Sequence, residues 1–198
     1  YGVKMVMNTE VTPAMVAEAK PDAVIVATGS NPLVLPIPGI NDTGVIHAGD
    51  LLDGKASVGK KVLVVGGGMV GCEVADFLGE LGHEVSVIEL RDQLGPDVIP
   101  EHRKFLMKDF EAYKVQGVTG AKVAQFFTDG VSYTLADGTE GRLEGFDNVV
   151  LAMGYRNNDT ISEEIKKIVA ETYVIGDAVK ARKALDATAE GLNAALEI

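Results

Sequence analysis

The sequence predicts an α/β fold that combines a parallel sheet with a short antiparallel meander. The stretch VLVVGGGMVGCEVADFLGELGHEVSVIEL, residues 62–90, contains an apolar run, a glycine-rich turn, a helical pattern and a second apolar run. Similar short apolar runs that end in glycine, VIVATG and VVLAMG, lie before and after it, and continuous apolar runs are typical of strands buried in a parallel sheet. Residues 121–145 alternate apolar and polar side chains instead, which predicts antiparallel strands.

The first element after the N-terminal segment is DAVIVATG, residues 22–29, which predicts a strand buried on both faces. The segment that follows contains three prolines, Pro32, Pro36 and Pro38. Prolines at this density exclude a regular helix, so we expect an extended connector.

The central β-turn-α-β unit begins with the strand KKVLVVG, and a helix is expected after Gly71. Its apolar positions fall on one face at 3.6 residues per turn: Val70, Val74, Phe77, Leu78 and Leu81. Gly82 is placed to end this helix, and HEVSVIEL predicts the next strand.

A second helix is expected to start near Pro100 and to end at Gly117. Its apolar stripe consists of Leu106, Phe110 and Tyr113. The meander over 121–145 follows, bounded by the turn sequences TDG and ADGT.

The last part of the chain returns to buried strands and helices. NVVLAMG, residues 148–154, predicts a strand, and TISEE predicts a capping box from Thr160 to Glu163 that opens a short helix. TYVIGD predicts the final strand, and the closing helix carries Leu185, Leu192 and Leu196 on one side.

Composition excludes several classes of function. The 198 residues carry a net charge of −11 and a sequence pI of about 4.7, so we expect no nucleic-acid partner and no anionic membrane surface. No apolar run reaches the roughly 18 residues of a membrane span, and nothing marks a signal peptide. A single cysteine, Cys72, fits a cytoplasmic location and cannot bind an iron–sulfur cluster. The histidines His47, His83 and His102 lack metal-ligand spacing.

The glycine turn carries the chemistry. Gly66, Gly68 and Gly71 form G-x-G-x-x-G between a strand and a helix. In such a turn the first glycine permits the tight bend, the second lets a pyrophosphate approach the backbone, and the third allows close helix–strand packing. The pyrophosphate then faces the helix N-terminus, which indicates a dinucleotide site. The alternative is a glycine-rich turn that binds nothing, which the strand–helix–strand context disfavours.

Two acidic residues, Glu73 and Glu89, lie near the turn in the sequence. Glu89 ends the second strand 18 residues after Gly71, close to the roughly 20 expected for an acid that accepts hydrogen bonds from the adenosine ribose. It favours NAD(H) over NADP(H), although Arg91 could weaken that preference. The alternative for Glu89 is a solvated acid at a strand end. For Glu73 it is a first-turn acid stabilised by the helix dipole.

Four motifs in order resemble a known family. VIVATGS, the glycine-turn unit, VVLAMGYRNN and YVIGDAVKARKALDATAEGLNAALEI are similar to segments of the pyridine nucleotide–disulfide reductase superfamily. Among its members, the chain most resembles the C-terminal part of the NADH:flavin oxidoreductases related to old yellow enzyme, 2,4-dienoyl-CoA reductase and enoate reductase. The resemblance covers nearly the whole chain.

The resemblance implies that an NAD(H)-binding Rossmann-like domain is inserted in a partial FAD-type ββα domain. It places the partial FAD domain at residues 1–48, the NAD(H) domain at 49–153 and the return to the FAD domain at 154–198. Ala27, Thr28 and Gly29 would be the first crossover, and Ala152 and Gly154 the second. Gly176 and Asp177 match the family's Gly-Asp motif, whose aspartate binds the FAD ribitol; the alternative for Asp177 is a helix N-cap. The complete set of expected cofactor-binding residues is Gly66, Gly67, Gly68, Met69, Val70, Gly71, Glu73, Glu89, Ala152, Gly154, Ala27, Thr28, Gly29, Gly176 and Asp177.

By the same resemblance, the chain is a segment of an enzyme that passes hydride from NADH to flavin and reduces an enone or a related substrate. A barrel with FMN, an iron–sulfur cluster and the rest of the flavin domain are expected upstream. No catalytic acid or base is expected in this chain, which alone should be inactive. The alternatives are a non-catalytic NAD(H)-binding module and another two-dinucleotide reductase, of the NADH oxidase or ferredoxin reductase type. A self-contained short dehydrogenase is disfavoured, since no tyrosine has a lysine four residues later.

Overall fold

The computed structural model describes residues 2–41 and 44–198. The chain divides into two compact units. The flanking unit consists of the chain up to Asn31 together with Tyr155–Ile198, and the central unit is Pro32–Gly154. The central unit is therefore an insertion within the sequence of the flanking unit.

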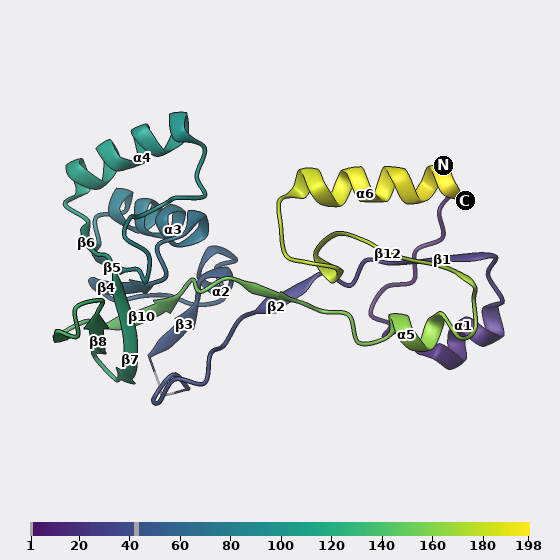
Figure 1. The fold of residues 1–198 in the computed structure, drawn as a ribbon, viewed down its shortest axis with the longest axis horizontal. Coiled ribbons are helices and arrows are strands. Elements are labelled where there is room, and N and C mark those ends of the chain that lie inside the picture. Colours follow the sequence, from purple (N-terminus) through teal and green to yellow (C-terminus); the bar gives the residue numbers. More distant parts are fainter. Residues whose placement is uncertain (1, 42–43) are drawn as a thin grey trace. The chain divides into compact units, whose positions relative to one another are not determined.

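The central unit is built on a five-stranded parallel sheet with the order β3–β10–β4–β5–β6 (Figure 1). Its strands are β3 (Val45–His47), β10 (Asn148–Leu151), β4 (Lys61–Val65), β5 (Glu84–Ile88) and β6 (Gln116–Val118). Its helices are α2 (Ala48–Leu52), α3 (Met69–Glu80) and α4 (Pro100–Tyr113). The meander is β7 (Ala121–Phe127), β8 (Gly130–Leu135) and β9 (Glu140–Leu143), paired antiparallel as expected.

The core lies on both faces of this sheet, and β4 contributes to both because its successive side chains point in opposite directions. Val62 and Val64 pack in a cluster with side chains of α3 and α4. Leu63 and Val65 pack in a second cluster with side chains of β7 and β8. Burial of each such side chain contributes about 1.5–3 kcal/mol, so the two layers hold the strand in one register.

Helix α3 differs from its predicted apolar face. Phe77 and Leu81 are exposed, whereas the buried residues are Gly71, Cys72, Val74, Ala75, Leu78 and Gly79. The reason is that small residues at four-residue spacing allow a close approach: a Cβ added to Gly79 would lie 2.8 Å from the ring of Tyr113 in α4. Gly82, at φ +84°, follows the helix end as predicted.

Helix α4 begins at Pro100 as predicted but ends differently. Lys114, at φ +61°, is its C-cap residue, and Gly117 lies within β6. The chain turns out of the helix before the glycine because the next strand of the sheet begins at Gln116.

The flanking unit contains a two-stranded parallel sheet and short helices. β1 (Ala23–Val26) pairs with β12 (Glu171–Val174). Ile25 is 41% exposed, so β1 is not buried on both faces as predicted, because this sheet has only two strands in the described chain. The helical elements are α1 (Pro13–Ala19), α5 (Ser162–Ile165), the 3₁₀ turn η1 (Gly176–Ala178) and α6 (Ala184–Glu197).

One detail of the flanking unit corrects the sequence interpretation, and a second adds to it. Thr160 does not cap α5, because Ile161 is the N-cap residue; the carboxylate of Asp159 instead accepts from the backbone N–H of Ser162 at 3.0 Å and from its hydroxyl at 2.5 Å. The α6 leucines, Leu185, Leu192 and Leu196, are exposed.

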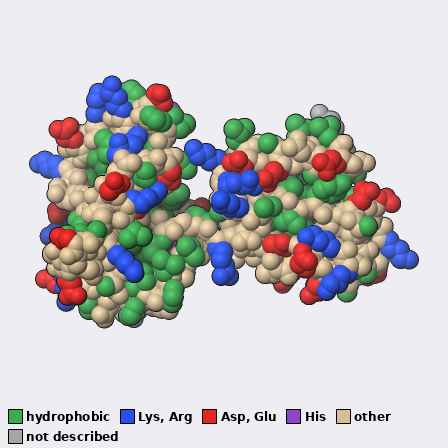
Figure 2. All heavy atoms as spheres, viewed as in Figure 1, with side chains coloured by type: hydrophobic (Ala, Val, Ile, Leu, Met, Phe, Trp, Pro, Cys, Tyr) green, Lys and Arg blue, Asp and Glu red, His purple; other side chains and the backbone are tan. Residues whose placement is uncertain are grey.

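The chain passes between the units along β2 (Ser30–Pro32) and β11 (Tyr155–Asn157), which pair with each other. The compact units divide after Asn31 and after Gly154, whereas the family resemblance implies a first boundary after residue 48. Residues 45–47 belong with the central sheet because β3 pairs with β10. In the face shown in Figure 2, acidic and basic side chains are interspersed over both units.

Candidate functional site

The glycine turn joins β4 to α3 at the carboxyl end of the central strand. Gly66 has φ +105°, and a Cβ there would lie 2.4 Å from the carbonyl oxygen of Ala152. A Cβ on Gly71 would lie 1.8 Å from the carbonyl oxygen of Gly66. Both positions therefore require glycine for the backbone to close, which is the role predicted for the first and third residues of the motif.

Gly68 has different surroundings. Its backbone, at φ −72° and ψ −172°, suits any residue. The atoms nearest to a Cβ there would be side-chain ends, Arg91 Nη2 at 3.1 Å and Asp97 Oδ2 at 3.4 Å. The Gly68 side of the turn is thus bordered by movable charged groups and not by backbone. A glycine at this position leaves open the space that a side chain would otherwise fill.

Helix α3 begins at Met69, two residues before Gly71. The first helical hydrogen bond runs from the Cys72 N–H to the Gly68 carbonyl at 2.9 Å, so the end of the glycine motif forms the first turn of the helix. Val70 is partly buried beside it. Glu73 is exposed and lies beyond the first turn of α3, so it is not an acid stabilised there by the helix dipole.

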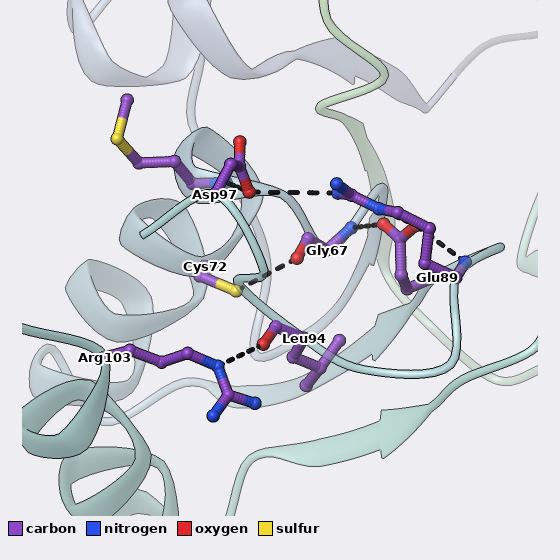
Figure 3. Close-up of polar contacts among 8 residues, drawn as sticks. Gly67, Cys72, Glu89, Leu94, Asp97 and Arg103 are labelled. Atoms are coloured by element: carbon purple, nitrogen blue, oxygen red, sulfur yellow. Dashed lines mark hydrogen bonds and ion pairs between the residues drawn. The ribbon is translucent and has the colours of Figure 1, made fainter. Parts of the chain in front are cut away.

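Glu89 is 6% exposed and directly follows β5. Its Oε2 accepts from the Gly67 N–H at 2.5 Å, and its Oε1 accepts from the backbone N–H and Nε of Arg91, both at 2.9 Å (Figure 3). Burial alone raises the pKa of this carboxyl, but the hydrogen bonds from Arg91 and Gly67 lower the pKa overall. Glu89 is therefore an ionised group that braces the glycine turn, and not a solvated acid.

The segment after β5 completes the surroundings of the turn. Asp97 Oδ1 accepts from the Met69 N–H at 3.0 Å. The Gly95 N–H donates to the Gly67 carbonyl at 2.7 Å, and Arg103 Nε donates to the Leu94 carbonyl at 2.8 Å. The role of Asp97 has no clear signal in the sequence beyond the turn sequence Gly-Pro-Asp at 95–97.

Cys72 is fully buried next to this segment, and its thiol donates to the Gly67 carbonyl at 3.3 Å (Figure 3). Burial raises the pKa of the thiol to about 11, with the charge of Asp97 adding to the effect. A thiol with this pKa stays protonated at neutral pH, so Cys72 is a packing residue and not a nucleophile.

The second crossover residues also lie in the central unit. The Ala152 N–H donates to the Val65 carbonyl at 2.8 Å, and its carbonyl closes over Gly66. Gly154 has φ +97°, and its carbonyl accepts from the Leu33 N–H at 2.9 Å. These two residues thus contribute backbone and not side-chain chemistry.

In the flanking unit the first crossover and the Gly-Asp motif come together. Ser30, next to Ala27–Gly29, donates from its hydroxyl to Asp177 Oδ2 at 3.0 Å, across 147 positions of sequence. Gly29 has φ +75°, and the Thr28 hydroxyl donates to the Asn158 carbonyl.

The Gly-Asp motif has further partners within the same unit. Asp177 lies inside η1, whose N-cap is Ile175, so it is not a helix N-cap; its Oδ1 accepts from the Arg182 N–H at 3.1 Å. The Gly176 N–H donates to Glu190 Oε2 at 2.7 Å, a contact that the sequence did not indicate. Both oxygens of Asp177 thus accept hydrogen bonds from neighbouring segments.

Residues 2–41 and 44–198 contain neither a metal-binding cluster nor a membrane-spanning helix. No group of three or more histidine, cysteine, aspartate or glutamate side chains could hold a metal ion there. Likewise, no helix in that part of the chain is long and apolar enough to cross a membrane.

Comparisons with known proteins find matches along nearly the whole chain. The family described as pyridine nucleotide-disulphide oxidoreductase matches residues 2–190. An NADH oxidase of Thermoanaerobacter brockii is 34% identical over 207 residues, covering 100% of this chain and 31% of that protein. A cinnamate reductase of Clostridium sporogenes is 29% identical over 182 residues, covering 90% of this chain and 27% of that protein.

Among solved structures, a 2-naphthoyl-CoA reductase in complex with 2-naphthoyl-CoA superposes with a TM-score of 0.89 at 30% identity, covering 100% of this chain and 30% of that one. The chain therefore spans roughly a third of the length of the relatives it matches.

Proposed function

The chain belongs to the pyridine nucleotide-disulphide oxidoreductase family, and we propose that its central unit binds NAD(H) at the turn between β4 and α3. The observation that carries this proposal is the pair of glycines, Gly66 and Gly71, that the backbone requires, with Gly68 between them facing only movable side chains. Together with the N-terminus of α3, this arrangement supports a diphosphate site.

Different residues of the site contact different parts of NAD(H) in this proposal. The diphosphate lies against Gly68 and the first turn of α3, where backbone N–H groups and the helix dipole favour an anion. Glu89 is ionised and accepts from the Gly67 N–H. In the proposal it also accepts hydrogen bonds from the adenosine ribose, and its charge repels the 2′-phosphate of NADPH. This supports a preference for NADH over NADPH.

For the flanking unit we propose that Asp177 and Gly176 contact the ribitol end of FAD, with Ala27, Thr28 and Gly29 nearby in the same unit. The hydrogen bond from Ser30 to Asp177 supports this, because it brings the two motifs together. The sequence contains one strand–G-x-G-x-x-G–helix turn, in the central unit, and the diphosphate of FAD needs such a turn of its own. We therefore expect the chain by itself not to retain FAD.

The proposed role within a complete enzyme is electron entry, in which NADH supplies a hydride to flavin. The residues of this chain bind and orient the dinucleotides; none is required as an acid or base. FMN, an iron–sulfur cluster and the substrate site would belong to other parts of the enzyme.

The similar proteins named as cinnamate reductase and 2-naphthoyl-CoA reductase support an acceptor with a carbon–carbon double bond conjugated to a carbonyl group. The similarity to an NADH oxidase supports the alternative proposal, that the complete enzyme is itself of the NADH oxidase type.

Calorimetric titration of the 198-residue chain with NADH, NADPH and FAD, each alone, tests the proposal. We expect saturable NADH binding, NADPH binding weaker by about tenfold, which is ~1.4 kcal/mol, and colourless protein after purification. Gly68→Val should abolish NADH binding, and Glu89→Arg should narrow or reverse the preference. Absence of NADH binding by the folded chain would refute the dinucleotide site, and equal NADPH binding would refute the role of Glu89.

A further inference from the structure

The carboxylate of Asp97 lies on the open side of the glycine turn. Its Oδ1 accepts from the Met69 N–H at the start of α3, at 3.0 Å. A Cβ built on Gly68 would lie 3.4 and 3.5 Å from its two oxygens. Figure 3 shows Asp97 reaching toward the turn from the segment that follows β5. An anionic group of the protein itself therefore borders Gly68 and uses an N–H group of the helix N-terminus.

This position coincides with the one assigned to the diphosphate of NAD(H), so the inference rests on the proposed function. A carboxylate at a helix N-terminus is stabilised by the same N–H groups and dipole that favour a phosphate. Two anions cannot share them without strong repulsion. We infer that Asp97 is an internal competitor, which the diphosphate must displace from the Met69 N–H before NAD(H) binds.

The segment that carries Asp97 is anchored at Leu94 and Gly95. The Gly95 N–H is bonded to the Gly67 carbonyl, and Arg103 holds the Leu94 carbonyl. A Cβ on Gly67 would lie 2.5 Å from Leu94, which shows how closely the segment packs on the turn. Asp97 is thus held over the helix N-terminus by a fixed backbone and does not reach it by chance.

The Asp97 side chain can still leave without disturbing this anchor. It is 52% exposed, so rotation of its own side chain carries the carboxylate into solvent. The exchange therefore requires a rotamer change and not an opening of the 91–99 segment.

Arg91 gives the exchange a second partner. Its Nε is held by Glu89, while its Nη2 lies 3.9 Å from Asp97 Oδ1 and 3.1 Å from the Cβ position on Gly68. When Asp97 turns away, this end of the guanidinium faces the diphosphate. The Met69 N–H and Arg91 thus contact Asp97 in the free chain and the diphosphate in the complex, so Asp97 helps to set the affinity for the nucleotide.

The test compares three chains by NADH calorimetry at low salt: the parent, Asp97→Asn and Asp92→Asn. Asp97→Asn retains an oxygen for the Met69 N–H but removes the charge, so NADH should bind about three- to tenfold more tightly than to the parent. Asp92 is the matched control, because it is exposed in the same segment and makes no hydrogen bond or ion pair within residues 2–41 and 44–198. Asp92→Asn makes the same change in net charge, and its NADH affinity should stay within about twofold of the parent.

Thermal unfolding without nucleotide supplies the second readout. Asp97→Ala removes the acceptor of the Met69 N–H, so its melting temperature should fall while its NADH affinity still rises. Unchanged or weaker NADH binding by Asp97→Asn, or an equal gain in Asp92→Asn, would overturn the competitor role and leave the dinucleotide site standing. A parent chain that does not bind NADH would instead refute the proposed function, and this inference with it.

Discussion

Two single-methyl substitutions in the glycine turn should separate binding from folding. Gly68→Ala and Gly71→Ala each add one Cβ, three residues apart in the same motif. At Gly68 the added carbon meets the ends of two flexible side chains, at 3.1 Å and beyond. At Gly71 it meets the carbonyl oxygen of Gly66 at 1.8 Å, where only a backbone movement can relieve the overlap.

The expected magnitudes follow from these distances. Contacts below 3.0 Å are essentially never made by a real Cβ, so the Gly71 and Gly66 backbones must separate by about 1.2 Å. Such overpacking costs ~1–3 kcal/mol or more, and the better helix propensity of alanine offsets at most ~1 kcal/mol. We expect a net loss of about 2 kcal/mol for Gly71→Ala, which lowers the melting temperature by about 4–8 °C in a chain of this size.

Gly68→Ala should leave the melting temperature within about 2 °C of the parent, since its backbone conformation suits alanine and Arg91 can move. Its NADH affinity should fall by at least about tenfold, because the methyl group occupies the approach of the diphosphate. Calorimetric melting and NADH titration of both variants give the comparison. A Gly68→Ala chain with full affinity, or a Gly71→Ala chain as stable as the parent, would refute this assignment of roles.

Three further predictions concern titratable groups. Because the pKa of Glu89 is lowered in the folded chain, its ionised form stabilises the fold fully above the ordinary glutamate pKa of about 4.3. This stabilisation is lost as the pH falls through the lower pKa of the folded state. In the Glu89→Gln chain, the free energy of unfolding should therefore decrease less steeply as the pH is lowered. Cys72, buried with a pKa of about 11, should resist iodoacetamide at about pH 8 in the folded chain and react once the chain is unfolded in urea. Burial and the neighbouring Asp109 raise the pKa of Asp76, and its buried Oδ1 lacks a hydrogen-bond partner within the described residues. The charged form of Asp76 therefore destabilises the fold above that pKa. Asp76→Asn should stabilise the chain by about 0.5 kcal/mol at neutral pH, and this gain should disappear at acid pH, where Asp76 is protonated.

The sequence predicts the central features of the turn because they depend on local residues. Glycine is needed at positions 66 and 71 because of contacts within the strand–turn–helix unit itself and with Ala152, which directly follows β10. The strands β4 and β5 on either side follow from apolar runs, and the meander follows from alternation. The family assignment is confirmed by the match over residues 2–190.

What the sequence did not predict depends on contacts between distant segments. Asp97 reaches Met69 across 28 positions, and Ser30 reaches Asp177 across 147, and neither spacing has a local pattern. The buried face of α3 was misjudged because close packing selected its small residues over Phe77. These features depend on tertiary packing, which the periodicity of a single sequence does not predict.

The central claim is that NAD(H) binds at the turn between β4 and α3. Amide chemical shifts of the ¹⁵N-labelled chain during NADH titration test it most directly. We predict that the amide signals of Gly67, Gly68 and Met69 move progressively and saturate with the same dissociation constant that calorimetry gives, and that they stay unchanged in the Gly68→Val chain. Saturable NADH binding that leaves these three signals in place, while signals elsewhere in the chain move, would contradict the claim.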